Sequence, residues 1–158
     1  MAFENIDFIS APEESGSAQF RLKFTSGRTG RALLRVCGLG YGLFWLNGER
    51  VSPDLFTAPV SDYRKTLWYN EYDVTDLLAD GENLLAVWLG NGFFNESFDS
   101  AWGHNRAAWR DSNRFLLELS VGGEFVAGSA GEWRSNPHTA VLRNELRSGE
   151  TFDFQQFN

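Results

Sequence analysis

The chain has 158 residues, 42% of them hydrophobic and 15% aromatic, which is enough for one domain whose core needs no metal or disulfide. A net charge of −7 disfavours nucleic acid as a partner, because a phosphate backbone is bound by a positively charged face. No apolar run approaches the roughly 18–20 residues that span a bilayer, so the sequence predicts no membrane insertion.

The first 17 residues end in a polar, turn-rich run and are predicted to form a lead-in segment to a single domain over residues 18–158. Their opening is acidic where a signal peptide would be basic, which predicts a cytoplasmic protein if Met1 is the natural start. The single cysteine, Cys37, lies in an apolar run and is predicted to be a buried, inert thiol.

Three strands are predicted in the first third of the domain. Residues 19–24 alternate between apolar and polar side chains, the period of a strand with one buried face. Residues 31–38 form a more continuous apolar strand. Residues 40–51 are predicted to form a hairpin around Asn47-Gly48, a pair typical of type I′ turns.

A helical corner is predicted near the middle of the chain, because residues 72–92 change structural period twice. Asp73 or Thr75 is expected to cap one helical turn by accepting a backbone N–H, and Gly81 to provide its left-handed exit. Leu77 and Leu78 are expected to press the turn onto a sheet. A corner of this kind is typical of a β-sandwich.

The remaining predicted strands are short and separated by turns. No helical stretch exceeds about two turns, so we expect an all-β fold, an antiparallel jelly-roll β-sandwich with one short helical corner. The further strands are expected at residues 66–72, 83–89, 113–121 and, after a Gly122-Gly123 turn, 124–127, with closing strands near Trp133 and at residues 140–142 and 151–157.

Five motifs follow one another in a characteristic order. They are the Asn47-Gly48 hairpin, Ser61-Asp62-Tyr63, the Y-D-V-T-x-L-L corner from Tyr72, Gly90-Asn91-Gly92-Phe93-Phe94, and Gly149-Glu150-Thr151-Phe152-Asp153. With this succession, the chain from about residue 20 to residue 153 resembles the N-terminal β-sandwich module of bacterial α-L-rhamnosidases, glycoside hydrolase family 78. That module is related to carbohydrate-binding module family 67.

The resemblance implies a domain without catalysis of its own, because the catalytic carboxylates of that family lie in a separate (α/α)₆ barrel. The expected function is a non-catalytic domain that supports the barrel of a parent α-L-rhamnosidase and shapes substrate access. Its expected partners are the following domains of that glycosidase and rhamnose-containing carbohydrate. Two alternatives stay open: a carbohydrate-binding module for L-rhamnose or a related sugar, and an interaction domain that binds no sugar.

Residues 90–110 are the longest stretch without periodicity and are rich in aromatic residues, so we expect an ordered loop. Aromatic rings pack on the C–H faces of sugars while amides bind the hydroxyls. The competing interpretation is that these aromatics pack in the core or between domains, and Trp45 and Trp88, in predicted strands, are assigned to the core or a sheet face. The candidate sugar contacts are Phe94, Trp102 and Trp109 as platforms and Asn91, Asn95 and Asn105 as polar groups.

No cofactor is expected, and Ca²⁺ is the one metal considered. Asn47 and Asp54 offer oxygen ligands of the kind that Ca²⁺ prefers. In relatives that bind rhamnose through calcium, a G-D-N-L segment stands where this chain has residues 52–55, so Pro53 replaces the Asp and Asp54 the Asn. The resemblance therefore implies that one calcium ligand is missing. The acidic residues of the corner and loop show no spacing that makes a glycosidase pair.

Overall fold

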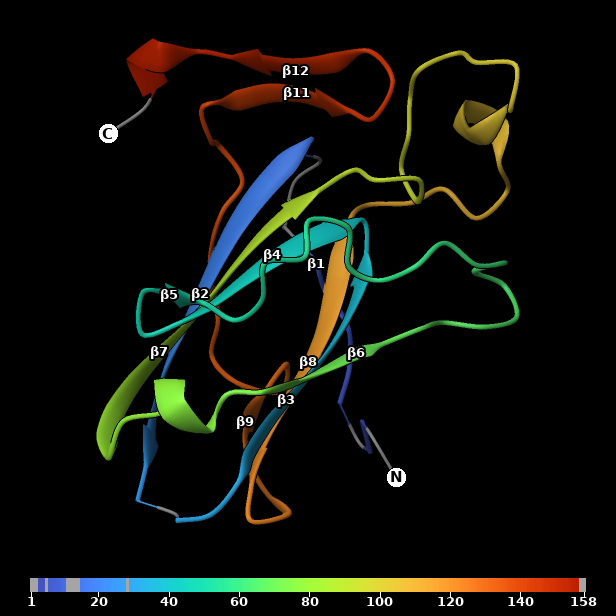
Figure 1. Ribbon diagram of the computed structural model, residues 1–158. Coiled ribbons are helices and arrows are strands. Elements are labelled where there is room, and N and C mark those ends of the chain that lie inside the picture. Colours follow the sequence, from blue (N-terminus) through green and yellow to red (C-terminus); the bar gives the residue numbers. More distant parts are fainter. Residues whose placement is uncertain (1–2, 5, 11–14, 28, 157–158) are drawn as a thin grey trace.

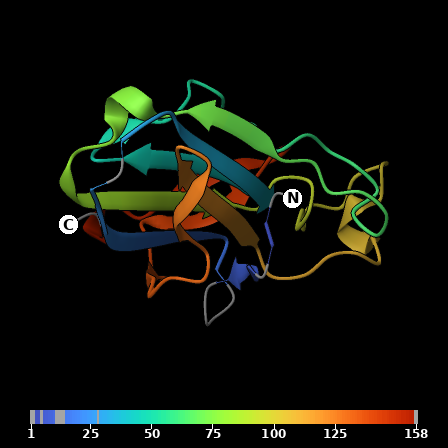
Figure 2. The same ribbon diagram turned by 90° about the horizontal axis from the view of Figure 1, so that it is seen from below.

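The computed structural model describes residues 3–156 apart from residues 5, 11–14 and 28, and it is an antiparallel, nearly all-β structure (Figure 1, and Figure 2 from below). The first sheet has the order β1 (Ile9–Ser10), β8 (Arg114–Val121), β3 (Ala32–Leu39), β6 (Asn70–Asp73), and β9 (Glu124–Gly128) also pairs with β8. The second sheet has the order β10 (Arg134–Asn136), β2 (Ser17–Ser26), β7 (Gly81–Gly90), β4 (Tyr41–Leu46), β5 (Glu49–Arg50).

The core lies between these two sheets. Along β7 every second residue is buried, so Leu85, Val87 and Leu89 face inward while their neighbours face outward. Phe20 of β2 meets Phe115 of β8 edge to face, with ring centroids 5.0 Å apart, and this contact joins the two sheets. The two sheets therefore pack face to face as a sandwich, which confirms the predicted all-β class; the jelly-roll order of its strands stays a prediction.

The corner forms where it was expected, as the 3₁₀ turn η1 (Thr75–Leu77). Asp73 Oδ1 accepts both the N–H (3.1 Å) and the hydroxyl (2.6 Å) of Thr75, whose hydroxyl oxygen in turn accepts the N–H of Ala32 at 2.9 Å. Gly81 leaves the corner with φ at +89°. Asp73 thus ties the turn to β3 through Thr75.

The hairpin between β4 and β5 has the predicted type I′ turn, because Asn47 (φ +54°) and Gly48 (φ +88°) are both left-handed. The Asn47 amide oxygen accepts the N–H of Leu84 at 2.9 Å, and its nitrogen donates to the Leu77 carbonyl at 2.9 Å. The hairpin turn and the helical corner are therefore held to each other by one side chain.

Some boundaries differ from those predicted. The strand expected at residues 66–72 is limited to β6, because residues 66–69 pair with no other strand of the described chain. Part of the lead-in is a strand, since β1 pairs with β8, whereas its residues 11–14 lie outside the described residues, as does residue 157 of the last predicted strand. Cys37 is buried as predicted, and burial raises the pKa of its thiol to about 11.

At one end of the sandwich a second hairpin, β11 (Val141–Glu145) and β12 (Gly149–Phe152), lies beside the long loop of residues 91–110 (Figure 1). The loop contains η2 (His104–Arg106), and the chain leaves β12 through η3 (Phe154–Gln156). No helix in the described part of the chain is long and apolar enough to cross a membrane.

Asp73 gives the corner a testable pH dependence. Its hydrogen bond from the Thr75 hydroxyl, followed by that from Arg31, lowers the pKa of the carboxyl from its ordinary value of 3.8 to about 2. Because the folded pKa is below the unfolded one, the stabilisation is complete above about pH 5 and is lost as the pH falls toward 2. Asp73→Asn should therefore lower the melting temperature much more at neutral pH than at pH 2.

Asp76→Asn is the matched control, since Asp76 lies one residue beyond Thr75 in the same corner and is exposed. The melting temperature of Asp76→Asn should stay close to that of the parent chain at both pH values. A deficit in Asp73→Asn that is the same at pH 2 and pH 7 would show that charge plays no part.

Candidate functional site

The loop of residues 91–110 is anchored to the β11–β12 hairpin by an ion pair whose carboxylate is buried and whose guanidinium is partly exposed. Glu96 of the loop has an exposed fraction of 0%, and both of its carboxylate oxygens accept hydrogen bonds from Arg147 Nη1, at 2.7 and 2.5 Å. The ring nitrogen Nδ1 of His104 lies 3.2 Å from the same carboxylate. A buried carboxylate needs such partners, because removing it from water without them is costly.

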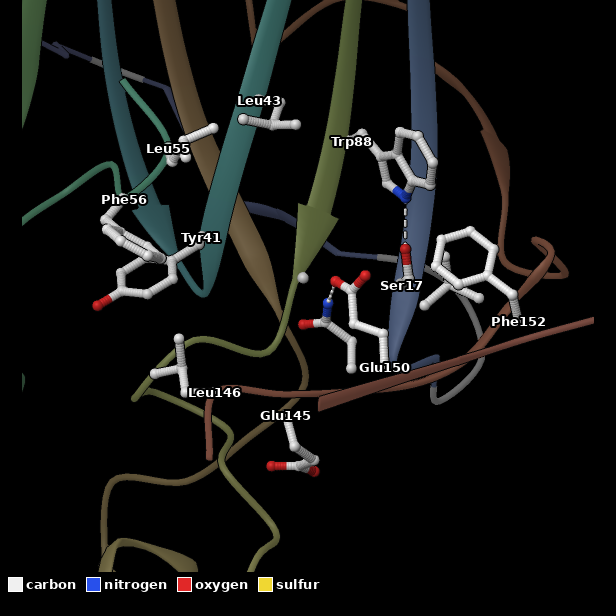
Figure 3. A pocket seen from close by; sticks show the side chains of 13 residues that line it. Ser17, Tyr41, Leu43, Leu55, Phe56, Trp88, Glu145, Leu146, Glu150 and Phe152 are labelled. Atoms are coloured by element: carbon white, nitrogen blue, oxygen red, sulfur yellow. Dashed lines mark hydrogen bonds between the residues drawn. The ribbon is translucent and has the colours of Figure 1, made fainter. Parts of the chain in front are cut away.

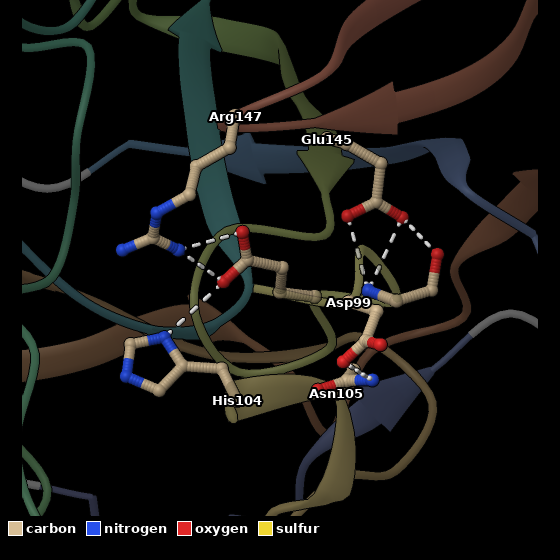
Figure 4. A network of polar contacts seen from close by, with 7 residues as sticks. Asp99, His104, Asn105, Glu145 and Arg147 are labelled. Atoms are coloured by element: carbon tan, nitrogen blue, oxygen red, sulfur yellow. Dashed lines mark hydrogen bonds and ion pairs between the residues drawn. The ribbon is translucent and has the colours of Figure 1, made fainter. Parts of the chain in front are cut away.

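A second buried carboxylate makes the reciprocal contact, from the hairpin to the loop (Figure 4). Glu145 accepts the N–H of Ser97 at 3.0 Å and also its hydroxyl. Next to it, Asn91 donates its backbone N–H to Asn144 Oδ1 at 3.0 Å and its amide to the Asn144 carbonyl at 2.8 Å. Each segment thus supplies one acid to the other.

Aromatic contacts continue this junction toward the second sheet. The Arg147 guanidinium lies over the ring of Phe93, 5.4 Å from its centroid, and His104 meets the same ring edge to face at 5.2 Å. Phe93 in turn contacts Tyr41 at the start of β4, with centroids 6.1 Å apart. The loop, the hairpin and β4 are therefore one packed unit.

The hairpin approaches the end of β7 closely at Gly90, where the nearest atoms belong to the Asn144 side chain. A Cβ added at Gly90 would lie 2.7 Å from Oδ1 of Asn144, a distance that no side chain tolerates without a shift. Held in this place, the hairpin forms one wall of a groove on the outer face of the second sheet.

The groove has a volume of about 470 Å³ and mostly apolar walls. Figure 3 shows Tyr41, Leu55 and Phe56 on one side and Trp88 and Phe152 on the other, with Glu150 between them. Glu150 accepts a hydrogen bond from Asn144 at 2.6 Å, and the Trp88 indole N–H donates to the Ser17 hydroxyl. The full lining is Ser17, Tyr41, Leu43, Leu55, Phe56, Trp88, Gly90, Val141, Asn144, Glu145, Leu146, Glu150 and Phe152.

Exposed apolar side chains continue from the groove in two directions. Phe56 is 64% exposed on the loop after β5, and Phe154 is 81% exposed just before the end of the described chain. Phe154 stacks on Phe152, which lines the groove, with centroids 6.2 Å apart. Apolar surface of this extent is typical of a face that contacts another part of a protein.

The aromatic residues predicted to bind sugar differ in their exposure. Phe94 is only 4% exposed and packs against Tyr63, so it has no open ring face, and its assignment as a platform is wrong. Trp109 is half-buried between Tyr63 and Arg64. Trp102, at 74% exposed, is the open ring among the three.

The three predicted asparagine contacts hold the loop together. Asn91 is buried, and its amide oxygen accepts a hydrogen bond from Asn113 at 2.8 Å. Asn95 Oδ1 accepts from Arg110 at 3.1 Å, and Asn105 donates to Asp99 at 3.1 Å. The hydrogen bonds of Asn95 and Asn105 are thus within the loop, whereas those of Asn91 tie the start of the loop to Asn113 and to the β11–β12 hairpin.

The two residues considered for calcium are both engaged in hydrogen bonds within the chain. The Asn47 amide joins the hairpin turn to the corner, and Asp54 Oδ2 accepts the hydroxyl of Tyr72 at 3.0 Å. Among the described residues, no group of three or more His, Cys, Asp or Glu side chains is arranged to hold a metal ion.

The sequence analysis missed the groove, although a signal was present. Five neighbouring outward positions on β4 and β7 are apolar or aromatic, where a solvated sheet face would carry polar residues. They are Tyr41, Leu43, Trp45, Ala86 and Trp88. Reading these strands as apolar on both faces would have indicated a covered or binding outer face.

Comparison with known proteins identifies the family. The sequence model of the α-L-rhamnosidase N-terminal domain matches residues 27–158. The chain belongs to this family.

The rhamnosidase N-terminal domain has relatives within much longer proteins. An α-L-rhamnosidase of Formosa agariphila is 35% identical over 130 residues, which cover 77% of this chain and 13% of that protein. An α-L-rhamnosidase of Streptomyces avermitilis is 31% identical over 153 residues, which cover 90% of this chain and 14% of that protein. The chain thus spans about one seventh of the length of these rhamnosidases or less.

Solved structures share the fold. The crystal structure of a Streptomyces avermitilis α-L-rhamnosidase in complex with L-rhamnose superposes with a TM-score of 0.74 at 29% identity, covering 92% of this chain and 14% of that one. An Aspergillus terreus α-L-rhamnosidase superposes with the same TM-score of 0.74 at 24% identity, covering 98% of this chain and 19% of that one. The latter likeness is one of fold.

The Glu96–Arg147 pair can be tested by removing one partner. Arg147→Met should lower the free energy of unfolding by about 3 kcal/mol, because it leaves the Glu96 carboxylate buried without a cation of fixed charge. Urea unfolding followed by tryptophan fluorescence measures this. Arg143→Met on the same hairpin removes an exposed guanidinium whose partner among the described residues is the Ser148 carbonyl, and it should change stability by no more than about 0.5 kcal/mol. Equal losses in the two variants would refute a special role for the buried pair.

Proposed function

We propose that this rhamnosidase N-terminal domain is a non-catalytic part of an α-L-rhamnosidase-like glycoside hydrolase, in which it supports the catalytic barrel and borders the path of the substrate. The observation that carries the proposal is that two buried glutamates of the domain, Glu96 and Glu145, are bonded to neighbouring residues. Glu96 is enclosed by Arg147 and His104, and Glu145 is occupied by Ser97 and Asn91. Glu145 lies along the groove, but its carboxylate is taken up by Ser97 and Asn91, and Glu96 does not line the groove. Neither is therefore free to act as one of the two facing acids that glycosidase chemistry requires.

The outer face supports the second half of the proposal. Its groove is lined by apolar and aromatic side chains, and Phe154 extends that surface to the last described residues. The relatives continue far beyond the length of this chain. A following domain of the parent, meeting this face, would bury Phe56, Phe152 and Phe154, which otherwise lie in water at a cost in free energy.

The chain alone should therefore hydrolyse no rhamnoside. Incubation of the 158-residue chain with 4-nitrophenyl α-L-rhamnopyranoside should release nitrophenol no faster than buffer does, while a complete α-L-rhamnosidase serves as the positive control. Release by this chain that disappears in Glu96→Gln or Glu145→Gln, with the fold retained, would contradict the proposal.

A second candidate function is recognition of L-rhamnose by the loop of residues 91–110, and the exposure of Trp102 is what favours it. Calorimetric titration with L-rhamnose would then give a dissociation constant on the order of millimolar or lower. Binding should be lost in Trp102→Ala and kept in Phe98→Ala, an exposed aromatic of the same loop. Titrations with and without Ca²⁺, and with the Asp54→Ala variant, test whether sugar binding depends on a calcium ion at Asp54. If none of these titrations gives a heat of binding, the sugar-binding candidate is excluded and the supporting role is the one that remains.

A further inference from the structure

The outer face of the second sheet has a second hollow, on the far side of Trp88 from the groove. Its volume is about 630 Å³, and Trp88 lines both spaces. This size falls within the range of small-molecule sites, roughly 300–1,000 Å³. Its lining consists of Gln19, Phe20, Arg21, Trp45, Ala86, Val87, Trp88, Arg134, Ser135 and Asn136.

The strand register places the outward side chains in rows across the hollow. In one row Arg134 of β10 lies opposite Arg21 of β2, which lies opposite Ala86 of β7, which lies opposite Trp45 of β4. Ala86 is the smallest side chain of this row, so the floor of the hollow is at Ala86. The arginine pair stands on one side of it and Trp45 on the other.

The arginine pair has no neutralising partner. Directly opposed like charges on antiparallel strands repel each other and destabilise the pair. In the part of the chain that the structure describes, neither guanidinium has an ion-pair or hydrogen-bond partner, and no carboxylate lines the hollow. Two unpaired guanidiniums side by side in a chain of net charge −7 form a local site for an anionic group, with donors that suit carboxylate or sulfate oxygens.

The other walls suit a ring. Trp45 and Trp88 are half-buried on the outer face, and the Trp88 indole is oriented by its hydrogen bond to Ser17. Tryptophan faces pack on the C–H face of a pyranose. Gln19 and Asn136, opposite each other in the next row, provide amides that donate and accept hydrogen bonds as sugar hydroxyls do.

We propose that this hollow binds one ring of an acidic saccharide, with Arg21 and Arg134 on its carboxylate or sulfate and the two tryptophans against the ring. The site needs no metal, and it is separate from the loop that contains Trp102. It goes beyond the supporting role, and the test for rhamnoside hydrolysis has no bearing on it.

Three sugars test the ligand class in calorimetric titrations of the 158-residue chain at low salt. They are methyl β-D-glucuronide, glucose 6-sulfate and neutral methyl β-D-glucoside. We expect a dissociation constant on the order of millimolar for at least one charged sugar, and binding about tenfold weaker or worse for the neutral one. The two charged ligands distinguish a carboxylate site from a sulfate site. Affinity should fall as salt screens the exposed arginines.

Variants locate the binding. Arg21→Gln and Arg134→Gln should each raise the dissociation constant for the charged sugar about tenfold. Ala86→Leu should abolish binding, because the larger side chain fills the floor of the hollow while both guanidiniums remain. Lys23→Gln is the matched control, because Lys23 faces outward two residues along β2 with the same charge but does not line the hollow. Circular dichroism and the melting temperature confirm that each variant is folded.

Several outcomes would overturn the proposal. They are equal binding of the neutral and charged sugars, equal weakening by Lys23→Gln and Arg21→Gln, or no binding of any of the three sugars. Titration with inorganic sulfate is a further control. If sulfate binds as tightly as the charged sugars and Ala86→Leu changes nothing, the arginines attract anions in general and there is no saccharide site.

Discussion

The reciprocal exchange of buried acids between the loop of residues 91–110 and the β11–β12 hairpin is the constraint on which the rest of this end of the molecule depends. Glu96 reaches from the loop to Arg147, and Glu145 reaches from the hairpin to Ser97. Neither segment belongs to the two large sheets, so neither is held by their hydrogen-bond ladders. Together with the bonds from Asn91 to Asn144, the exchange holds the wall formed by Glu150 and Phe152 in place over the sheet.

This constraint also explains why acidic residues in an aromatic loop need not indicate chemistry. A buried ion pair adds little net stability over well-packed apolar residues, but breaking it is costly, so it fixes one arrangement against others. For the loop of residues 91–110, whose one regular element is the short turn η2, that specificity matters, because hydrophobic contacts alone are not directional. Asn91, Asn95 and Asn105 act in the same way through their amides. Residue types that suit sugar binding suit loop ordering equally well.

Local signals in the sequence predicted the parts of the fold that local physics determines. The Asn47-Gly48 turn follows from two positive φ angles, the corner from Asp73, Thr75 and Gly81, and the strands from their alternation. Of the strand expected at residues 66–72, the part at residues 66–69 was wrong, because it pairs with no strand of the described chain and leaves Leu67, Trp68 and Tyr69 exposed. The second hollow was not predictable, because Arg21 and Arg134 are neighbours only through a strand register that joins distant parts of the chain.

Trp88 divides the outer face into two chemically different halves. On the hairpin side the polar group between the aromatic walls is the carboxylate of Glu150, whereas the other side carries Arg21 and Arg134 and no acid among its described lining residues. The chain leaves the sandwich through β12 and η3, next to the acidic half, with Phe152 and Phe154 exposed along that exit. A domain that follows in the same polypeptide would therefore meet the groove first, since the exit lies beside it. The basic hollow lies beyond Trp88, so one sheet face has room for an interdomain contact and a separate ligand site.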